Sequence, residues 1–599
     1  MPSPHRGDRA HRNRVHYDHS EHAQMICGTG TGVLACIDIF LANWVQHDTA
    51  LLYQDLVRIS RVCRELRDKA NGHKTMVRSL HFPHSLLWLL PRSKRLDVVI
   101  ECVRQTSNHL QTLDLSPLGA LHGEEARHLL GGLTLHLSHR RKMMLLKDLT
   151  LPSIAICEQA SEFLATMSSL ARLDLSRCKV PDSRVARMLE GLPNLRRIAC
   201  GGDNALSSEG FSALGHAVSR MHALEEVSLS NCGMGAIQGG SEWVFSGLTA
   251  LQVLKLTNNR NVHSNGRSAQ AFGAFVGRMR AMHTLCLVNC RREREDVPAP
   301  NELWIGFMAT VAAGSVLRRL SIRGNGYNIK GCTALARSLD TMVLLEELDL
   351  SDNQIAGAGM QQLVVSLAHK PLKYLNLAEN DLGEEGSLSL VAMLPTMTTL
   401  ETLDLTDNGM EAAAGAVVCS LPATLVSLRL GNNGIDCRCL IAIAEIMHRL
   451  PALKALVLEN NEIADDGISQ FSQIMCEAVE RGKTCFHLIS LNLIANKIGS
   501  RGCSSLFSAL IRLPRIVDLR LGENLICEDG CMGIASALGA LTGLRELDLG
   551  CNRISKEACS TLRLIGRRRG LYLGLDNQAI VDVRSAANFP GIFIAKDFS

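Results

Sequence analysis

A frame of regularly spaced leucines constrains this chain more than any other feature. It reads L-x-x-L-x-L-x-x-N/C-x-L, and in its most regular part it returns every 27 or 28 residues, as at Leu345 and Leu372. The first positions are Leu146, Leu170, Leu195, Leu224, Leu251, Met282, Leu317, Leu345, Leu372, Leu400, Leu425, Leu453, Leu488, Ile516 and Leu544. LQTLDLSPL at Leu110 is a degenerate opening copy and RGLYLGLDNQ near Gly570 a degenerate closing copy. A fixed period of this size predicts a solenoid, because one repeat cannot bury its own leucines and must stack on its neighbours.

Each repeat changes its hydrophobic period in the middle, as LEELDLSDNQIAGAGMQQLVVSL over 345–367 illustrates. Leu348 and Leu350 are two apart, which predicts a short strand with both leucines on one side and Asp349 on the other. Leu363 and Leu367 are four apart, which predicts a helix over 354–367. A helix of this kind is the usual crossover between parallel strands.

An asparagine recurs where the chain leaves each predicted strand, as Asn353 does. Its side chain can donate to and accept from backbone groups that the turn leaves unpaired. The same place holds Asn259, Asn325, Asn380, Asn408, Asn433, Asn461, Asn496, Asn524 and Asn552, and in earlier repeats Cys178, Cys232 and Cys290. Six residues after the asparagine, a recurring glycine predicts a close backbone approach before the helix, at Gly359, Gly386, Gly467, Gly502 and Gly530.

This pattern resembles leucine-rich repeats of the ribonuclease-inhibitor type from about Leu110 to Asn577. The resemblance implies an α/β horseshoe with parallel strands on the concave face and helices on the convex face. The family includes inhibitors, immune receptors, GTPase activators and ubiquitin-ligase receptors. The fold therefore does not select among these functions.

Composition narrows the function classes. The formal net charge is +4, from 63 basic and 59 acidic residues, which indicates neither a nucleic-acid nor a membrane partner. The first 25 residues contain no apolar signal segment, and the apolar stretch 25–45 is interrupted by Asp38 and Asn43. We therefore expect a cytoplasmic protein, with the nucleus as an alternative, and we expect its 21 cysteines to be reduced thiols in the core. No motif predicts a catalytic site, a cofactor or a metal, so we expect no enzyme activity.

The predicted organisation has four parts: a His/Arg-rich arm over 1–24, a helical module over 25–105, repeats over 106–580 and a tail over 581–599. Within the module, LLYQDLVRISRVCRELRDKA carries one apolar stripe along a helix and resembles the second half of an F-box. MVRSL at 76–80 stands where that family has a Trp-Arg-Ser-Leu-like segment. The resemblance implies that an adaptor of cullin–RING ligases contacts Leu34, Ile37, Phe40, Leu41, Leu56, Ile59, Val62 and Leu66. The alternative is a plain helical cap on the first repeat.

The third, fifth and seventh positions of each frame are expected to face the concave side. A protein partner is therefore expected to contact Arg172, Arg197, Lys255, Arg319, Arg323, Glu347, Asp349, Tyr374, Asp404 and Arg429. The early positions are basic and the middle ones acidic, which predicts a docking face of two opposite charges. The alternative is an inner face that is simply solvated. Among these residues, Asp404 is expected to be exposed and tolerant of replacement.

We therefore expect a non-catalytic protein-binding scaffold, alternatively one that serves as an F-box-like substrate receptor of a cullin–RING ligase. Resemblance to Ran-type GTPase activators is weaker, because the C-terminal residues IVDVRSAANFPGIFIAKDFS are not acidic. A nuclease inhibitor would need an acidic face, whereas the early repeats are basic. A structural component of a cytoskeletal or ciliary assembly stays open. The long step from Met282 to Leu317 contains RREREDVPAPN and predicts an exposed, protease-sensitive loop.

Overall fold

The computed structural model describes residues 79–81, 92–106, 110–137, 145–176, 178–201, 208–231, 248–259, 266–290, 316–482, 487–512 and 515–575. They fall into two compact units, 1–205 and 206–599. The arm, the predicted adaptor-contacting residues from Leu34 to Leu66, Cys232 and the predicted loop after Met282 lie outside the described residues. Among those described, no helix combines the length and the apolar character that crossing a membrane requires.

Unit 1 alternates parallel strands with helices. Its elements are β1 (Ser79–His81), α5 (Arg92–Thr106), β2 (Thr112–Asp114), η1 (Ser116–Leu118), α6 (Gly123–Leu137), β3 (Asp148–Thr150), α8 (Glu158–Ala165), β4 (Arg172–Ser176), α9 (Asp182–Glu190) and β5 (Arg197–Gly201). The strands pair in sequence order, with the central leucines Leu80, Leu113, Leu149 and Leu173 in register. The repeat therefore sets both the strand and its pairing.

The first strand lies upstream of the predicted start of the repeats at residue 106. Leu80 of β1 pairs with Leu113 of β2 and is fully buried. β1 and α5 thus form a strand–helix pair within the stretch that the sequence assigned to a helical module. The end of MVRSL belongs to this strand. The signal is a degenerate frame, Val77-x-x-Leu80-x-Phe82, which lacks the turn asparagine.

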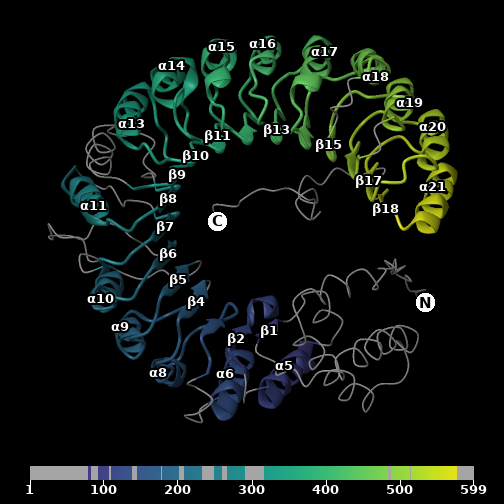
Figure 1. The fold of residues 1–599 in the computed structure, drawn as a ribbon. Helices are drawn as coiled ribbons and strands as arrows, with labels where there is room; N and C mark the ends of the chain where they lie inside the picture. The colour runs from purple at the N-terminus through teal and green to yellow at the C-terminus, as the bar shows by residue number, and fades with distance from the viewer. Residues whose placement is uncertain are drawn as a thin grey trace, which may run out of the picture. The chain divides into compact units, whose positions relative to one another are not determined.

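Unit 2 continues the alternation, with strands on the inner side of the curve and helices on the outer side (Figure 1). Its strands are β6 (Glu226–Ser230), β7 (Val253–Thr257), β8 (Thr284–Val288), β9 (Arg319–Ser321), β10 (Glu347–Asp349), β11 (Tyr374–Asn376), β12 (Thr402–Asp404), β13 (Ser427–Arg429), β14 (Ala455–Val457), β15 (Ser490–Asn492), β16 (Asp518–Arg520), β17 (Glu546–Asp548) and β18 (Tyr572–Gly574). Its helices are α10 (Ser208–Ser219), α11 (Gly266–Arg278), α13 (Ile329–Thr341), α14 (Ala356–Leu367), α15 (Gly383–Met393), η2 (Leu394–Thr396), α16 (Ala413–Cys419), α17 (Cys437–Ile446), η3 (Met447–Arg449), α18 (Asp465–Glu480), α19 (Ser500–Leu510), α20 (Glu528–Leu538) and α21 (Lys556–Arg569). The predicted α/β solenoid is confirmed.

The core consists of the frame leucines. Leu345, Leu348 and Leu350 are at most 1% exposed, and Leu363 and Leu367 of α14 are fully buried against them. The helix begins at Ala356 rather than at residue 354, because Gln354 has a left-handed φ angle of 59°, which a right-handed helix does not accept. The predicted change of period is therefore correct, and its boundary lies two residues later.

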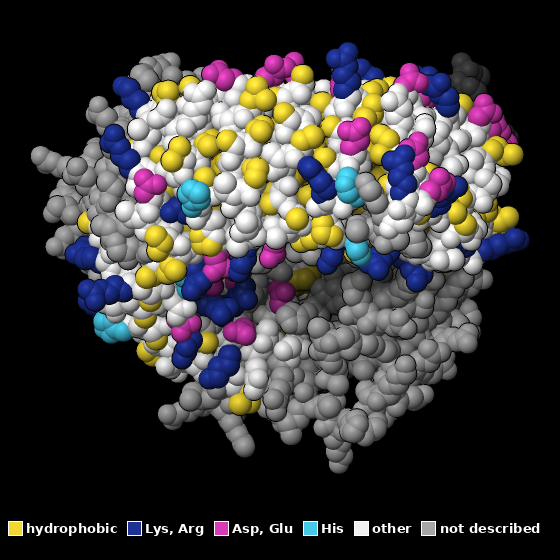
Figure 2. Space-filling model, turned by 45° about the horizontal axis from the view of Figure 1, so that its top comes forward, with side chains coloured by type: hydrophobic (Ala, Val, Ile, Leu, Met, Phe, Trp, Pro, Cys, Tyr) yellow, Lys and Arg dark blue, Asp and Glu magenta, His cyan; other side chains and the backbone are white. Residues whose placement is uncertain are grey.

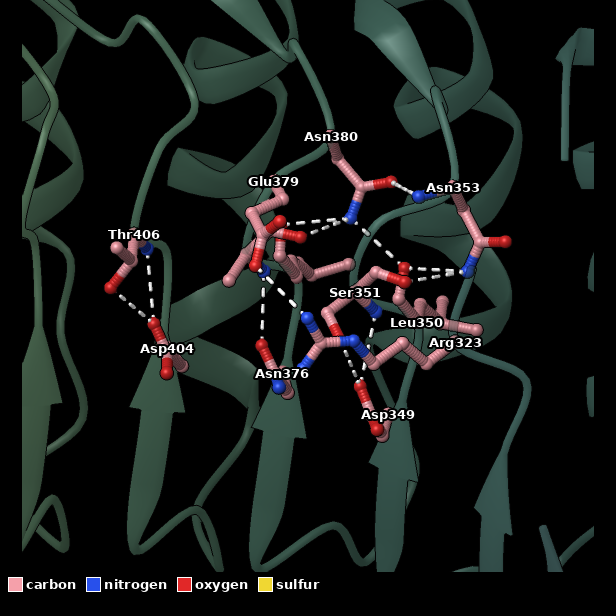
Figure 3. A network of polar contacts seen from close by, with 12 residues as sticks. Arg323, Asp349, Leu350, Ser351, Asn353, Asn376, Glu379, Asn380, Asp404 and Thr406 are labelled. Carbon is pink, nitrogen blue, oxygen red and sulfur yellow. Dashed lines mark hydrogen bonds and ion pairs between the residues drawn. The ribbon is translucent and has the colours of Figure 1, made fainter. Parts of the chain in front are cut away.

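The turn asparagines of neighbouring repeats bond to one another in an asparagine ladder, and Figure 3 shows its step from Asn353 to Asn380. Asn353 Nδ2 donates to the carbonyls of Ile322, Leu350 and Ser351 at 3.0, 2.8 and 3.0 Å. Its Oδ1 accepts from the backbone N–H of Asn325 at 2.8 Å, and its own N–H donates to Asn380 Oδ1 at 3.1 Å. The same two-way pattern holds for Asn325, Asn380 and Asn408, each of which binds the turn before it and donates its own N–H to the asparagine after it. The predicted double role as donor and acceptor is confirmed.

Cysteine fills the same place in two described early repeats. Cys290 is 1% exposed, and its Sγ donates to the Leu256 carbonyl at 3.4 Å. Cys178 Sγ donates to the Pro152 carbonyl at 3.3 Å. Burial raises the pKa of the Cys178 thiol to about 11 and that of Cys290 to about 12, so both remain neutral core thiols.

The recurring glycines do allow close packing, but they lie inside the first turn of the helix rather than before it. A Cβ on Gly502 of α19 would lie 2.3 Å from Ile468 Cγ2 of α18. A Cβ on Gly386 of α15 would lie 2.8 Å from the Gly357 Cα of α14. The approach is therefore between adjacent helices, which the spacing within one repeat does not reveal.

Candidate binding surface

The third, fifth and seventh frame positions of β9 to β13 project from the inner side of unit 2. We call this set the central inner face, and its charged and aromatic members are Arg319, Arg323, Glu347, Asp349, Tyr374, Asp404 and Arg429. The strands place these side chains side by side, because Glu347 is in register with Arg319 and with Tyr374. Residues about 28 apart in the sequence thus become neighbours.

Three arginines of this face form ion pairs with carboxylates of other repeats. Arg319 Nε lies 3.0 Å from Glu347 Oε2, and the Glu347 side chain is only 6% exposed. Arg323 reaches across a strand to Glu379, 3.2 Å away (Figure 3), and Arg429 lies 3.7 Å from Asp404 Oδ2. The expected separation into a basic and an acidic region is therefore only partial on this face, because the arginines at the boundary form ion pairs with adjacent carboxylates.

All three predicted partner-binding carboxylates are buried rather than exposed, Glu347 in its ion pair with Arg319 and the other two in hydrogen bonds to turns. Asp349 is 5% exposed and accepts from Ser351 N and Oγ at 3.0 and 2.7 Å and from Ser321 Oγ at 2.9 Å. Asp404 is 8% exposed and accepts from Thr406 N and Oγ1 at 3.0 and 2.6 Å. The expectation that Asp404 is exposed is wrong, because its carboxylate binds the backbone that ends its own strand.

Tyr374 lies between these two carboxylates on β11 and is half-buried. Burial raises the pKa of its phenol to about 12, and the charges of Asp349 and Asp404 act in the same direction. The phenol is therefore neutral at pH 7. Its aromatic ring lies beside two anions.

The predicted basic residues of the early strands lie outside the central inner face. Arg172 and Arg197 of unit 1 are exposed and in register on β4 and β5. Lys255 of unit 2 is half-buried on β7, in register with Cys286. Burial raises the pKa of the Cys286 thiol to about 12, so Lys255 stands beside a neutral sulfur.

Sequence reasoning missed the eighth frame position, which borders the inner face. Residues there have left-handed backbones, as in Asp352, Glu379 and Asp407 with φ angles of 57°, 57° and 56°. Their left-handed turn reverses the chain so that the next residue, the asparagine, points into the ladder. The signal was visible as the pairs Asp-Asn and Glu-Asn, which place a carboxylate beside each of these turns.

Farther along the inner side, a second group of carboxylates crowds together on β16 and β17. Arg520 Nε lies 3.2 Å from Asp518 Oδ1, and both residues are buried. Burial and then the charge of Asp518 raise the pKa of Glu546, which is in register with Asp518. The negative charge of Glu546 is thus disfavoured in the folded state.

The outer side of unit 2 differs from the inner face in the side chains that it exposes. Apolar side chains lie there among polar and charged ones, with no single charge prevailing (Figure 2). The exposed ones include Val365 of α14, Leu388 of α15 and Met532 of α20, which are 79%, 51% and 72% exposed. Single apolar residues of this kind are normal on a protein surface. The inner face, where neighbouring strands place charged and aromatic side chains in register, is therefore the better candidate for a binding surface.

Comparison with known proteins agrees with the repeat frame. The model of the leucine-rich-repeat family matches residues 343–364, 368–391, 396–419, 484–507 and 541–562. The ribonuclease inhibitor of Sus scrofa is 28% identical over 234 residues, which cover 33% of this chain and 49% of the inhibitor. NACHT, LRR and PYD domains-containing protein 14 of Homo sapiens is 28% identical over 209 residues, which cover 34% of this chain and 19% of that protein.

Among solved structures, an LRR protein of Leptospira interrogans aligns with a TM-score of 0.42 at 17% identity, covering 74% of this chain and 98% of that one. The chain spans about half the length of the ribonuclease inhibitor it matches and about a fifth of the NACHT protein. The sequence frame, the register of the strands and the match to the leucine-rich-repeat model agree: the chain carries leucine-rich repeats, which are similar in sequence to those of ribonuclease inhibitor.

Proposed function

We propose that the chain is a non-catalytic scaffold that binds a protein partner through the inner strand face of unit 2. The observation that carries this proposal is a contrast within each strand. The fourth frame position is Leu in nearly every strand of unit 2, whereas its third-position neighbours change from Arg319 to Glu347, Tyr374 and Thr402 along four successive strands. Core packing therefore keeps leucine on the buried side of each strand, whereas the side chains on the inner side vary.

The backbone beneath these side chains is rigid, which favours recognition. The asparagine ladder and the parallel pairing hold neighbouring repeats in one register, so the backbone loses little conformational entropy when a partner binds. The similarity to ribonuclease inhibitor, whose name describes an inhibitor of another protein, supports a binding role.

The test uses a photo-reactive phenylalanine analogue placed at single positions. Thr402 and Ser427 are half-buried on the inner face, and Ala358 and Ala416 are exposed on the outer helices. We expect the two inner positions to crosslink one common protein in cell extract, and the two outer positions not to crosslink it. Equal capture from both sides, or no capture above background, would refute the inner-face scaffold.

The finer proposal, an F-box-like receptor of a cullin–RING ligase, depends on residues 33–70 and is supported by the apolar stripe in 51–70. Its test is a pull-down of adaptor and cullin with the wild type and with Ile37→Asp/Phe40→Asp. Retention by the wild type and loss by the variant supports the ligase role. If the wild type retains neither protein, the ligase role fails and the scaffold proposal stands unchanged.

A further inference from the structure

The carboxylates of the central inner face and its border outnumber the arginines that pair with them. Each of Arg319, Arg323 and Arg429 is held by one carboxylate. Three further carboxylates form no ion pair with any described residue, and these are Asp349, Asp352 and Asp407. The face together with its border therefore carries a surplus of negative charge, although the chain as a whole has a formal net charge of +4.

The buried charge of Asp349 is not required by the turn that it caps. Its carboxylate receives only neutral donors, from Ser321 and Ser351. On the next strand Asn376 performs the same turn contact with a neutral amide, accepting from Ala378 N at 3.0 Å. A buried charge without a cation costs free energy that a neutral amide avoids. The charge of Asp349 thus suits a cation supplied from outside the described residues.

Tyr374 provides the second, independent element. It is the aromatic residue of this face, and it is half-buried between the strands that carry Asp349 and Asp404. A guanidinium group binds well where a carboxylate lies beside the face of an aromatic ring, because it can pair with the first and stack on the second. An aromatic ring flanked by anions therefore selects a cationic side chain over an apolar or acidic one.

We propose that Asp349, Asp352, Tyr374 and Asp407 receive an arginine side chain presented by a basic segment of the protein partner. This inference rests on the proposed function, because it names the chemistry of the partner at the same face. The exposed border carboxylates Asp352 and Asp407 attract the basic segment, and the ring of Tyr374 and the carboxylate of Asp349 hold one guanidinium. A nucleic acid does not fit, since its phosphates would meet unpaired carboxylates.

The experiment measures the anisotropy of fluorescein-labelled nona-arginine with the full chain. Asp352→Asn/Asp407→Asn removes two border charges and keeps the left-handed turns, which asparagine tolerates well. Glu384→Gln/Glu445→Gln changes the net charge equally at two exposed residues of the outer helices. We expect the inner variant to bind about tenfold more weakly and the outer variant to stay within about twofold of the wild type, as local charge complementarity requires.

A second pair of variants separates the ring from the charge. Tyr374→Phe keeps the aromatic face and should bind nona-arginine within about threefold of the wild type, whereas Tyr374→Ala should lose about tenfold or more. Circular dichroism melts show whether each variant is folded. Equal weakening by the inner and outer charge variants, or tighter binding of polyuridine than of nona-arginine, would overturn the inference. If inner crosslinks still capture a partner in that case, only the basic chemistry fails and the scaffold proposal survives.

Discussion

Replacing Asn408 by alanine tests whether the asparagine ladder carries the stability of the turns. Asn408 is 1% exposed. Its Oδ1 accepts from Asn380 N at 3.2 Å and from Leu382 N at 3.4 Å, and its Nδ2 donates to the Leu377 and Leu405 carbonyls at 2.9 and 3.0 Å. These contacts join two repeats at a place that water does not reach.

The size of the stability loss depends on which backbone groups lose their only hydrogen-bond partner when Asn408 is replaced. The Leu377 carbonyl also accepts from Asn380 Nδ2 at 2.9 Å, and the Leu405 carbonyl also accepts from Asn433 Nδ2 at 2.8 Å, so both stay bonded after the substitution. The N–H groups of Asn380 and Leu382 lose their hydrogen-bond acceptor, because both donate to Asn408 Oδ1. A buried donor left unsatisfied costs about 1–3 kcal/mol, and because the second bond is long we expect Asn408→Ala to lower the free energy of unfolding by about 2–4 kcal/mol.

Urea unfolding followed by circular dichroism measures this change, with Thr398→Ala in an exposed loop as the control. Asn408→Cys should fall between wild type and alanine, because Cys290 in the same place donates through its sulfur and receives a backbone N–H from Asn259. A loss of less than about 0.5 kcal/mol for Asn408→Ala, the range of an exposed substitution, would contradict the ladder argument.

Three other substitutions, one of them with a matched glycine control, test separate parts of the structure. Asp404→Ala should cost about 1–3 kcal/mol in urea unfolding, because it removes the acceptor of a buried turn, and a change within about 0.5 kcal/mol would favour the exposed assignment made from sequence. Gly502→Ala should destabilise strongly, since its Cβ would lie 2.3 Å from Ile468, whereas Gly131→Ala, with open space around it in α6, should stabilise by about 0.5–1 kcal/mol; equal melting temperatures would refute the packing argument. Glu546→Gln should raise the melting temperature at pH 7. Because burial raises the pKa of Glu546 in the folded state, the cost of its carboxylate grows as the pH rises from the unfolded-state pKa of about 4.3 through the folded pKa. The advantage of glutamine should therefore vanish below about pH 4, and an advantage independent of pH would contradict the raised pKa.

Local chemistry in the sequence determined the repeat itself. Leu348 and Leu350 at a spacing of two, Leu363 and Leu367 at a spacing of four, and Asn353 between them predict the strand, the helix and the turn of one repeat, because each period reflects the geometry of its own segment. The same frame repeated along the chain also predicts parallel stacking. These predictions needed no contact between distant residues, and the structure confirms them.

The tertiary structure decided what lies between repeats. The stacking of the repeats places Arg319 beside Glu347 and buries Asp404. It also packs the helix that contains Gly502 against the helix that contains Ile468. None of these relations is local. Two positions that the pattern places on the solvent side form an ion pair, with the Glu347 side chain buried, only once the register of the strands is known in three dimensions. β1 could not be predicted for a related reason: its pairing with β2, rather than a complete frame, makes it a strand.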